Sequence, residues 1–188
     1  MTIYIALLRG INVGGKNIIK MAELKHTFEA MGMSRIQTYI QSGNVLFESN
    51  EEEEPLRKRI EHELEAAFGF SATVVLRTAE EFKMVVANCP FSEEEVSEAD
   101  ASSEGESLYV SFLLEEPSRE GIERLRAFKN EGDEYRAEGR EVFLLFRHSI
   151  RKSKLANNLH KLGVSSTVRN WKTINKLVAL AQTMEVKA

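Results

Sequence analysis

Residues 69–74 read GFSATV, and residues 163–168 near the other end of the chain read GVSSTV. In both places a glycine follows an amphipathic helical pattern, where glycine is typical of a helix C-cap, and leads into a short strand. The predicted first strands of the two halves match as well, because IYI at residues 3–5 and LYV at 108–110 each place a tyrosine second. These short matches indicate one structural motif written twice.

The first half of the chain predicts the order β-α-β-β-α-β followed by one more helix. Its helices carry apolar residues at helical spacing, and the tripeptide SGN marks a hairpin turn. Pro55 opens the second helix, and a capping box of Thr78 and Glu81 begins the third. The predicted elements are a strand at 2–9, a helix at 21–31, a hairpin at 35–49, a helix at 55–68, a strand at 72–77 and a helix at 79–89.

The second half repeats this order. Ser118 leads a helix, the turn EGR at 138–140 joins a hairpin, and the last helix begins at about Asn170. The predicted elements are a strand at 107–114, a helix after Ser118, a hairpin at 133–146, a short helix at 155–162, a short strand at 164–168 and the final helix. The prediction for the fold class is therefore α+β, with two tandem α/β plaits of ferredoxin-like order.

The segment between the halves is acidic and almost free of apolar residues. Residues 92–106 read SEEEVSEADASSEGE, which predicts a linker or a long exposed loop. The predicted domains are thus a first plait at 1–91, an acidic linker at 92–106 and a second plait at 107–188.

Composition excludes several protein classes. The chain has 188 residues, of which 43% are hydrophobic and 29% charged, so a packed core is expected. No apolar run is long enough for a transmembrane helix, and the first residues do not resemble a signal peptide. Cys89 is the only cysteine, which rules out an intrachain disulfide. We expect a soluble cytoplasmic protein that needs no cofactor or metal and does not bind membranes.

The net charge of −4 conceals a strong asymmetry. Residues 51–106 hold 16 acidic and 5 basic side chains, whereas residues 147–188 hold 9 basic side chains and one acid, Glu185. Such segregation is typical of a surface that binds anions. It is equally compatible with two halves that attract each other across an internal interface.

The stretch LLRGINVGGKN at residues 7–17 has the glycine and lysine spacing of a phosphate-binding P-loop. Asn17 replaces the hydroxyl residue that would bind Mg²⁺, no partner aspartate follows another apolar strand, and the hairpins disfavour an all-parallel sheet. We therefore reject a P-loop NTPase. An electropositive loop that holds an anion remains a hypothesis, although the glycines alternatively serve only to shape the connection. Its candidate residues are Arg9, Asn12, Gly14, Gly15, Lys16 and Asn17.

No catalytic residue can be assigned from the sequence. The four histidines show no metal-ligand spacing, no G-x-S-x-G elbow is present, and Cys89 lies on an apolar helix face that favours a core position. An RNA-binding plait would expose aromatic side chains on its central strands, for which Tyr4, Tyr39 and Phe47 are candidates. Aromatic side chains in strands more often pack inside the protein.

The C-terminal stretch is basic and amphipathic. If the final helix begins near Val168, apolar residues from Trp171 to Ala181 share one side, while Arg169, Lys172 and Lys176 lie on the other. Asn170 is the expected N-cap, which would put helix N–H groups beside these charges. The candidate ligand-binding residues are Lys154, Asn157, Asn158, Arg169, Asn170 and Lys172. The alternative is a solvated basic face with Trp171 anchored in the core.

Three motifs together resemble a bacterial family described only as a domain of unknown function. They are ALLRGINVGGKNIIKMAELKHTFEAMG, TYIQSGNVLF and KLANNLHKLGV…STVRNWKTINKL. The resemblance spans nearly the whole chain and implies an α+β fold of two similar subdomains in the bacterial cytoplasm. It implies no activity. Between Asn158 and Gly163 this chain reads LHKL where relatives carry aromatic and acidic residues, which argues against an acid-base role there.

Three hypotheses for the function follow. The leading one is a phosphate-bearing ligand, nucleic acid or nucleotide, bound between the glycine loop and the basic C-terminal segment. The second is an enzyme that acts on a small anionic metabolite in the same place. The third is a structural or interaction module whose charged halves satisfy each other. The sequence leaves the oligomeric state open.

Overall fold

The computed structural model describes residues 1–187, which form two compact units. Unit 1 comprises Met1–Met84 and the chain from Asn175 onward, and unit 2 comprises Val85–Ile174. Two helices carry the chain between the units: α3 (Ala79–Ala87) leaves unit 1, and α7 (Trp171–Val186) returns to it. This division differs from the predicted boundaries, because the C-terminal part of the chain belongs to the first unit.

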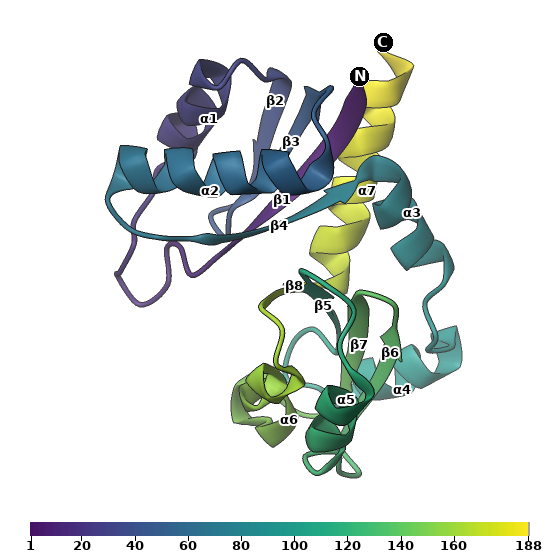
Figure 1. Cartoon of the computed structure of the whole chain (residues 1–188). Helices are drawn as coiled ribbons and strands as arrows, with labels where there is room; N and C mark the ends of the chain where they lie inside the picture. Colours follow the sequence, from purple (N-terminus) through teal and green to yellow (C-terminus); the bar gives the residue numbers. More distant parts are fainter. Residues whose placement is uncertain (188) are drawn as a thin grey trace. The chain divides into compact units, whose positions relative to one another are not determined.

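Unit 1 is an α/β plait whose antiparallel sheet has the strand order β2-β3-β1-β4 (Figure 1). The element order agrees with the predicted β-α-β-β-α-β. Its elements are β1 (Thr2–Arg9), α1 (Met21–Ala30), β2 (Ser34–Tyr39), β3 (Asn44–Ser49), α2 (Glu53–Phe68) and β4 (Thr73–Thr78).

Unit 2 has a second antiparallel sheet with the corresponding order β6-β7-β5-β8. Short 3-10 helices, η1 and η2, flank a single turn of α-helix where the sequence predicted one short helix. The elements are α4 (Glu93–Ser102), β5 (Leu108–Leu113), α5 (Arg119–Arg126), β6 (Asp133–Glu138), β7 (Glu141–Phe146), η1 (Ile150–Lys152), α6 (Lys154–Asn157), η2 (Leu159–Leu162) and β8 (Ser166–Asn170).

The two sheets share register as well as strand order. Tyr4 of β1 lies opposite Thr78 of β4, and Tyr109 of β5 lies opposite Asn170 of β8. The residue opposite each tyrosine then caps the next helix, because Thr78 accepts from the N–H of Glu81 at 3.2 Å and Asn170 accepts from that of Thr173 at 2.8 Å. The predicted α+β fold of two tandem plaits is therefore confirmed, with Tyr4 and Tyr109 in equivalent places. Descent by duplication stays a prediction.

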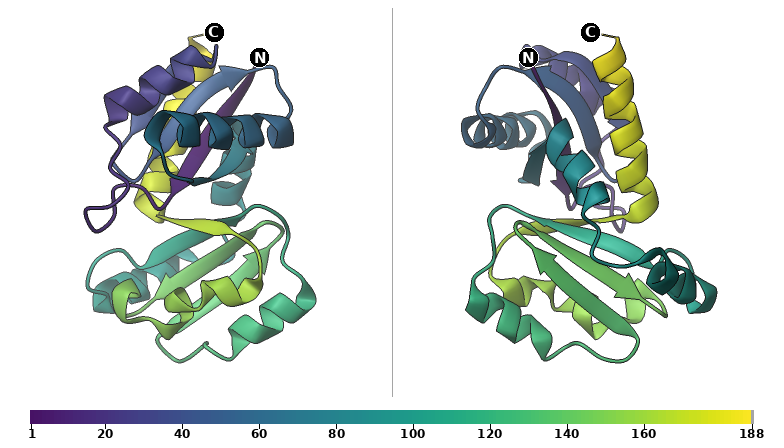
Figure 2. Two further views of the ribbon diagram at one scale, coloured as in Figure 1. Left: turned by 60° about the vertical axis from the view of Figure 1, so that its left-hand side comes forward. Right: turned by 90° about the vertical axis from the view of Figure 1, so that its right-hand side faces the viewer.

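In unit 1, α1 and α2 cover one face of the sheet, and the part of α7 from Asn175 onward lies on the other side (Figure 2). In unit 2, α5 and α6 lie on one side of the sheet. In unit 1, Tyr4 and Phe47 lie on the face that packs against α1 and α2, where they are 5% and 0% exposed and their rings stack at 5.9 Å. Burial of these two rings removes the exposed aromatic platform that an RNA-binding plait requires. In unit 2, α5 and η2 pack so closely that a Cβ on Gly121 would lie 2.5 Å from the carbonyl oxygen of Leu162.

The predicted acidic linker is instead mostly helical. Glu93–Ser102 form α4, whose N-terminus has a complete capping box: Ser92 accepts from the N–H of Glu95, and Glu95 accepts from that of Ser92. Ala99 packs inward and is fully buried. The prediction was wrong because it gave the acidity of the segment more weight than the local cap signal S-x-x-E. That signal provides partners for helix N–H groups whatever the charge of the segment.

Candidate functional site

The glycine loop of unit 1 forms a miniature hairpin. Val13 and Lys16 form an isolated antiparallel bridge, in which the Lys16 N–H donates to the Val13 carbonyl at 3.1 Å. Gly14 and Gly15 between them both have positive φ, 59° and 71°, as the two-residue type I′ turn demands. The glycines therefore shape a tight turn, and the backbone N–H of Lys16 is already bonded within it.

Two asparagines fasten this loop to the body of unit 1. The Asn12 amide donates to the carbonyls of Ile19 at 3.0 Å and Gln41 at 2.8 Å, and its oxygen accepts from the Ile19 N–H at 2.8 Å. The Asn17 amide donates to the Gly10 carbonyl at 3.0 Å. Both residues take positive φ themselves, which asparagine tolerates better than most residues. These two predicted ligand-binding residues thus have structural bonds that account for their presence.

The QSGN turn lies against the same loop. A Cβ on Gly43, which has φ 86°, would lie 2.6 Å from the Ile11 Cδ1 and 3.0 Å from the Leu8 Cβ. Buried Asn44 donates to the Tyr39 carbonyl at 2.8 Å and so closes the turn. The glycine loop and the QSGN turn, which are the first two sequence motifs, therefore pack together at the end of the unit 1 sheet. The side chains of Arg9 and Lys16 are exposed there.

Arg169 does not lie on an exposed helix face. It belongs to β8, is 7% exposed, and donates from Nη1 to the Thr167 hydroxyl at 2.8 Å and the Val168 carbonyl at 2.9 Å. Burial lowers the pKa of its guanidinium to about 10. The prediction was wrong because the helix begins at Trp171, three residues later than assumed. Arg169 precedes the helix and lies in a strand, where successive side chains point to opposite faces.

The other C-terminal candidates divide between structural and exposed positions. Asn170 caps α7 as predicted, and the Asn158 amide donates to the Lys154 carbonyl at 2.7 Å. Asn157 and Lys172 are exposed. Lys154 is exposed too, but it lines a pocket that the sequence did not reveal.

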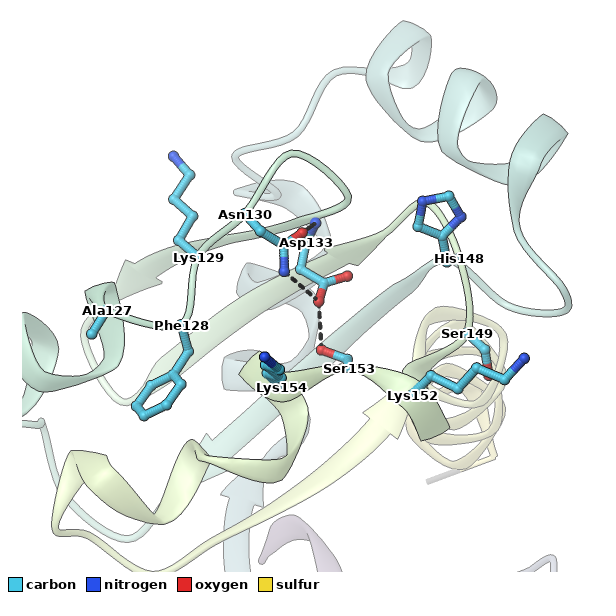
Figure 3. A pocket seen from close by; sticks show the side chains of 10 residues that line it. All are labelled: Ala127, Phe128, Lys129, Asn130, Asp133, His148, Ser149, Lys152, Ser153 and Lys154. Atoms are coloured by element: carbon cyan, nitrogen blue, oxygen red, sulfur yellow. Dashed lines mark hydrogen bonds between the residues drawn. The ribbon is translucent and has the colours of Figure 1, made fainter.

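This pocket of about 570 Å³ lies wholly within unit 2 (Figure 3). The loop between α5 and β6 forms one side of it, and the basic segment at 148–154, which includes η1, forms the other. Its lining residues are Ala127, Phe128, Lys129, Asn130, Asp133, His148, Ser149, Lys152, Ser153 and Lys154.

Asp133 is held firmly at the centre of the pocket. Its side chain is buried, the residue being 6% exposed, and Oδ2 accepts from the Ser153 hydroxyl at 2.7 Å and from the Asn130 amide at 3.3 Å. Asn130 is itself fixed, because its oxygen accepts from the N–H groups of Gly132 at 2.8 Å and Asp133 at 3.0 Å. Ser153 also caps α6 by accepting from the Ala156 N–H at 3.0 Å. One of the two carboxylate oxygens, Oδ2, is therefore held by two hydrogen bonds.

The pocket lining carries more positive than negative side chains. Lys129, Lys152 and Lys154 line the pocket with exposed side chains, so three lysines accompany one carboxylate. His148 lies beside the loop, since a Cβ on Gly132 would come within 2.8 Å of its Cδ2. The Ser103 hydroxyl holds the His148 backbone by donating to its carbonyl at 2.7 Å. The arrangement can attract an anion and also offers it a hydrogen-bond acceptor.

Sequence reasoning missed this cluster because its members lie far apart along the chain. The missed residues are Asp133, Asn130 and Ser153. The spacing N-x-x-D at 130–133 is a local signal, because an asparagine side chain that bonds backbone N–H groups two and three residues later is a typical turn. Nothing in the sequence pairs that turn with Ser153.

Within residues 1–187, no three histidine, cysteine, aspartate or glutamate side chains gather as they would around a metal ion. None of the helices described there is both long and apolar enough to cross a lipid bilayer. Cys89 is half-buried, and burial raises the pKa of its thiol, which disfavours the nucleophilic thiolate.

Comparison with known proteins agrees with the fold. Residues 1–143 match the family model described as protein of unknown function, DUF1697. No curated protein matches the chain significantly. A solved structure, that of the conserved bacterial protein SP0830 from Streptococcus pneumoniae, is similar with a TM-score of 0.73 and 23% identity, covering 96% of this chain and 98% of that one. Because the family match spans most of the chain and includes both N-terminal motifs, the protein belongs to the DUF1697 family.

Proposed function

We propose that unit 2 binds a small molecule that carries a phosphate group, in the pocket between the α5–β6 loop and residues 148–154. The observation that carries this proposal is a pocket lined by three lysines and by one fixed, buried carboxylate. Lysine ammonium groups are compact charges that bind phosphate through charge-assisted hydrogen bonds.

The pocket's dimensions favour a small ligand over a polymer. Its volume of about 570 Å³ lies within the range that small-molecule sites occupy, roughly 300–1,000 Å³. Nucleic acids, in contrast, bind along extended basic grooves and stack on exposed aromatic rings, and Tyr4 and Phe47 of unit 1 are buried. We therefore keep the anionic ligand predicted from the sequence, and we propose that it is a small molecule. Binding of nucleic acid is the alternative that the competition experiment tests.

The glycine loop is not required by this proposal. Its asparagines and the Lys16 N–H are engaged within unit 1. Arg9 and Lys16 remain candidates for a separate anion contact, because their side chains are exposed on a part of the chain without acidic residues. An anion contact at Arg9 and Lys16 would not depend on the pocket lysines of unit 2.

The proposal is tested by titrating inorganic phosphate into the full chain and into two variants. We expect Lys152→Ala to weaken binding about tenfold, the effect of losing one charge-assisted hydrogen bond. Lys172→Ala removes the same charge from an exposed position outside the pocket and should leave the affinity unchanged. Equal losses in both variants would indicate general charge attraction and contradict a pocket site.

A competition experiment separates a small ligand from nucleic acid. A single-stranded oligonucleotide should bind weakly and should not be displaced by phosphate if the pocket serves a small molecule. Tight oligonucleotide binding that falls steeply with salt, as counterion release demands, would favour the nucleic-acid alternative instead.

A further inference from the structure

We infer that the ligand of this pocket is a phosphorylated polyhydroxy compound, a polyol or sugar phosphate, one hydroxyl of which donates a hydrogen bond to Oδ1 of Asp133. This inference rests on the proposed function and adds a second group to the ligand. The lysines select the phosphate, and the carboxylate selects the neighbouring hydroxyl.

Asp133 has one carboxylate oxygen, Oδ1, that is free to accept a hydrogen bond and is held in a fixed position. Both described hydrogen bonds to the carboxylate reach Oδ2, from Ser153 and Asn130. Figure 3 shows the other oxygen on the opposite side of the carboxylate, towards His148. Because Asn130 is fixed by two backbone N–H groups, its own bond to Oδ2 helps to prevent the carboxylate from turning.

The free oxygen of Asp133, a residue of the pocket lining, is not completely buried. Within residues 1–187, the only buried side-chain nitrogen or oxygen that lacks a hydrogen-bond partner is the Ser111 hydroxyl. The free Oδ1 of Asp133 is therefore not sealed inside the protein, although the residue as a whole is only 6% exposed. When a ligand displaces solvent from such a carboxylate, the oxygen loses a hydrogen bond to water. A ligand that donates a new hydrogen bond to it avoids that cost.

The carboxylate of Asp133 determines which kind of ligand group can bond to it. An ionised carboxylate only accepts hydrogen bonds, so a carbonyl or a second anionic group of the ligand cannot satisfy it. The candidates are a hydroxyl and an ammonium group. Three lysines line the same pocket and would repel an ammonium group, whereas a neutral hydroxyl meets no such penalty. The charge balance therefore favours hydroxyls over amines.

The experiment compares four probes by calorimetric titration into the full-length protein: inorganic phosphate, propyl phosphate, glycerol 3-phosphate and phosphoethanolamine. Propyl phosphate has the carbon chain of glycerol 3-phosphate without its hydroxyls. We expect glycerol 3-phosphate to bind about tenfold more tightly than propyl phosphate, the effect of one hydrogen bond to a charged acceptor. Phosphoethanolamine should bind more weakly than glycerol 3-phosphate.

The variant Asp133→Asn sharpens the assignment. Its amide oxygen can still accept from Ser153 and Asn130, while its NH₂ group replaces the free oxygen and cannot accept. The variant should bind inorganic phosphate at least as tightly as the parent, because a negative charge is lost, and should no longer prefer glycerol 3-phosphate to propyl phosphate. The comparison of probes on the parent protein does not depend on how well this variant folds.

The outcomes distinguish the two proposals. Binding of inorganic phosphate with equal affinities for propyl phosphate and glycerol 3-phosphate would overturn the polyol inference and leave the anion site standing. Tighter binding of phosphoethanolamine than of glycerol 3-phosphate would overturn the choice of a hydroxyl donor. Failure of all four probes to bind would overturn both proposals.

Discussion

The glycine loop of unit 1 and the pocket of unit 2 differ in the way their polar groups are used. The loop resembles a ligand-binding motif in sequence, yet Asn12, Asn17 and the Lys16 N–H are all engaged in hydrogen bonds within unit 1. The pocket carries no sequence motif, yet one oxygen of its buried Asp133 has no described partner. The comparison teaches that a glycine- and asparagine-rich motif can encode backbone geometry alone, whereas an open acceptor in a basic pocket points to a ligand.

The largest effect expected from this contrast is on stability, at Gly43 of the QSGN turn. The Gly43→Ala substitution adds a Cβ 2.6 Å from Ile11 Cδ1 at a residue with φ 86°, so it combines overpacking with backbone strain. We expect a loss of about 3 kcal/mol in the free energy of unfolding, measured by denaturant titration. The matched control is Gly14→Ala, where a Cβ meets open space and only the strain of positive φ remains, about 1 kcal/mol. Equal losses would show that the turn is not closely packed.

The next effect concerns Asn12, which ties the loop to the rest of unit 1. Asn12→Ala removes three hydrogen bonds, two of them donated by the side-chain amide. We expect about 2 kcal/mol of lost stability and no change in phosphate affinity. Asn157→Ala, at an exposed asparagine of α6, should change neither quantity. If Asn12→Ala instead lost phosphate binding at unchanged stability, the glycine loop would be a ligand-binding site.

The smallest effect is a dependence of unit 2 stability on pH. The hydrogen bond from Arg136 and the cap at Ser92 hold the pKa of the Glu95 carboxyl below its ordinary value of 4.5. Because the folded pKa is the lower one, the stabilisation is present above pH 4.5 and is lost as the pH falls through the folded pKa. Glu95→Gln should therefore lower the melting temperature at pH 7 and make little difference in strong acid. A constant difference at both pH values would contradict this origin.

Most of the fold could be predicted, because local chemistry determines it. Thr78 and Glu81, Ser118 and Gly69 carry cap signals that the structure uses as expected. The exceptions arose where one signal outweighed another. Acidity concealed the Ser92 cap of α4, and the expected early start of the last helix concealed the strand position of Arg169.

The candidate site could be predicted only in part, for a physical reason. Lys154 was identified because charge is visible in the sequence, but its role depends on which groups it faces. The contact between the hydroxyl of Ser153 and the carboxylate of Asp133 is a tertiary one, formed when β6 and α6 come together in unit 2. No spacing along the chain encodes it.

The most direct test of the account is the affinity for inorganic phosphate of two double variants, each of which removes two exposed positive charges. One is Lys152→Ala with Lys154→Ala in the pocket, and the other is Arg9→Ala with Lys16→Ala on the glycine loop. The account predicts that the pocket variant loses about tenfold or more in affinity, while the loop variant binds as the parent protein does. The reverse result, with binding lost only in the loop variant, would contradict the assignment of the anion site to unit 2.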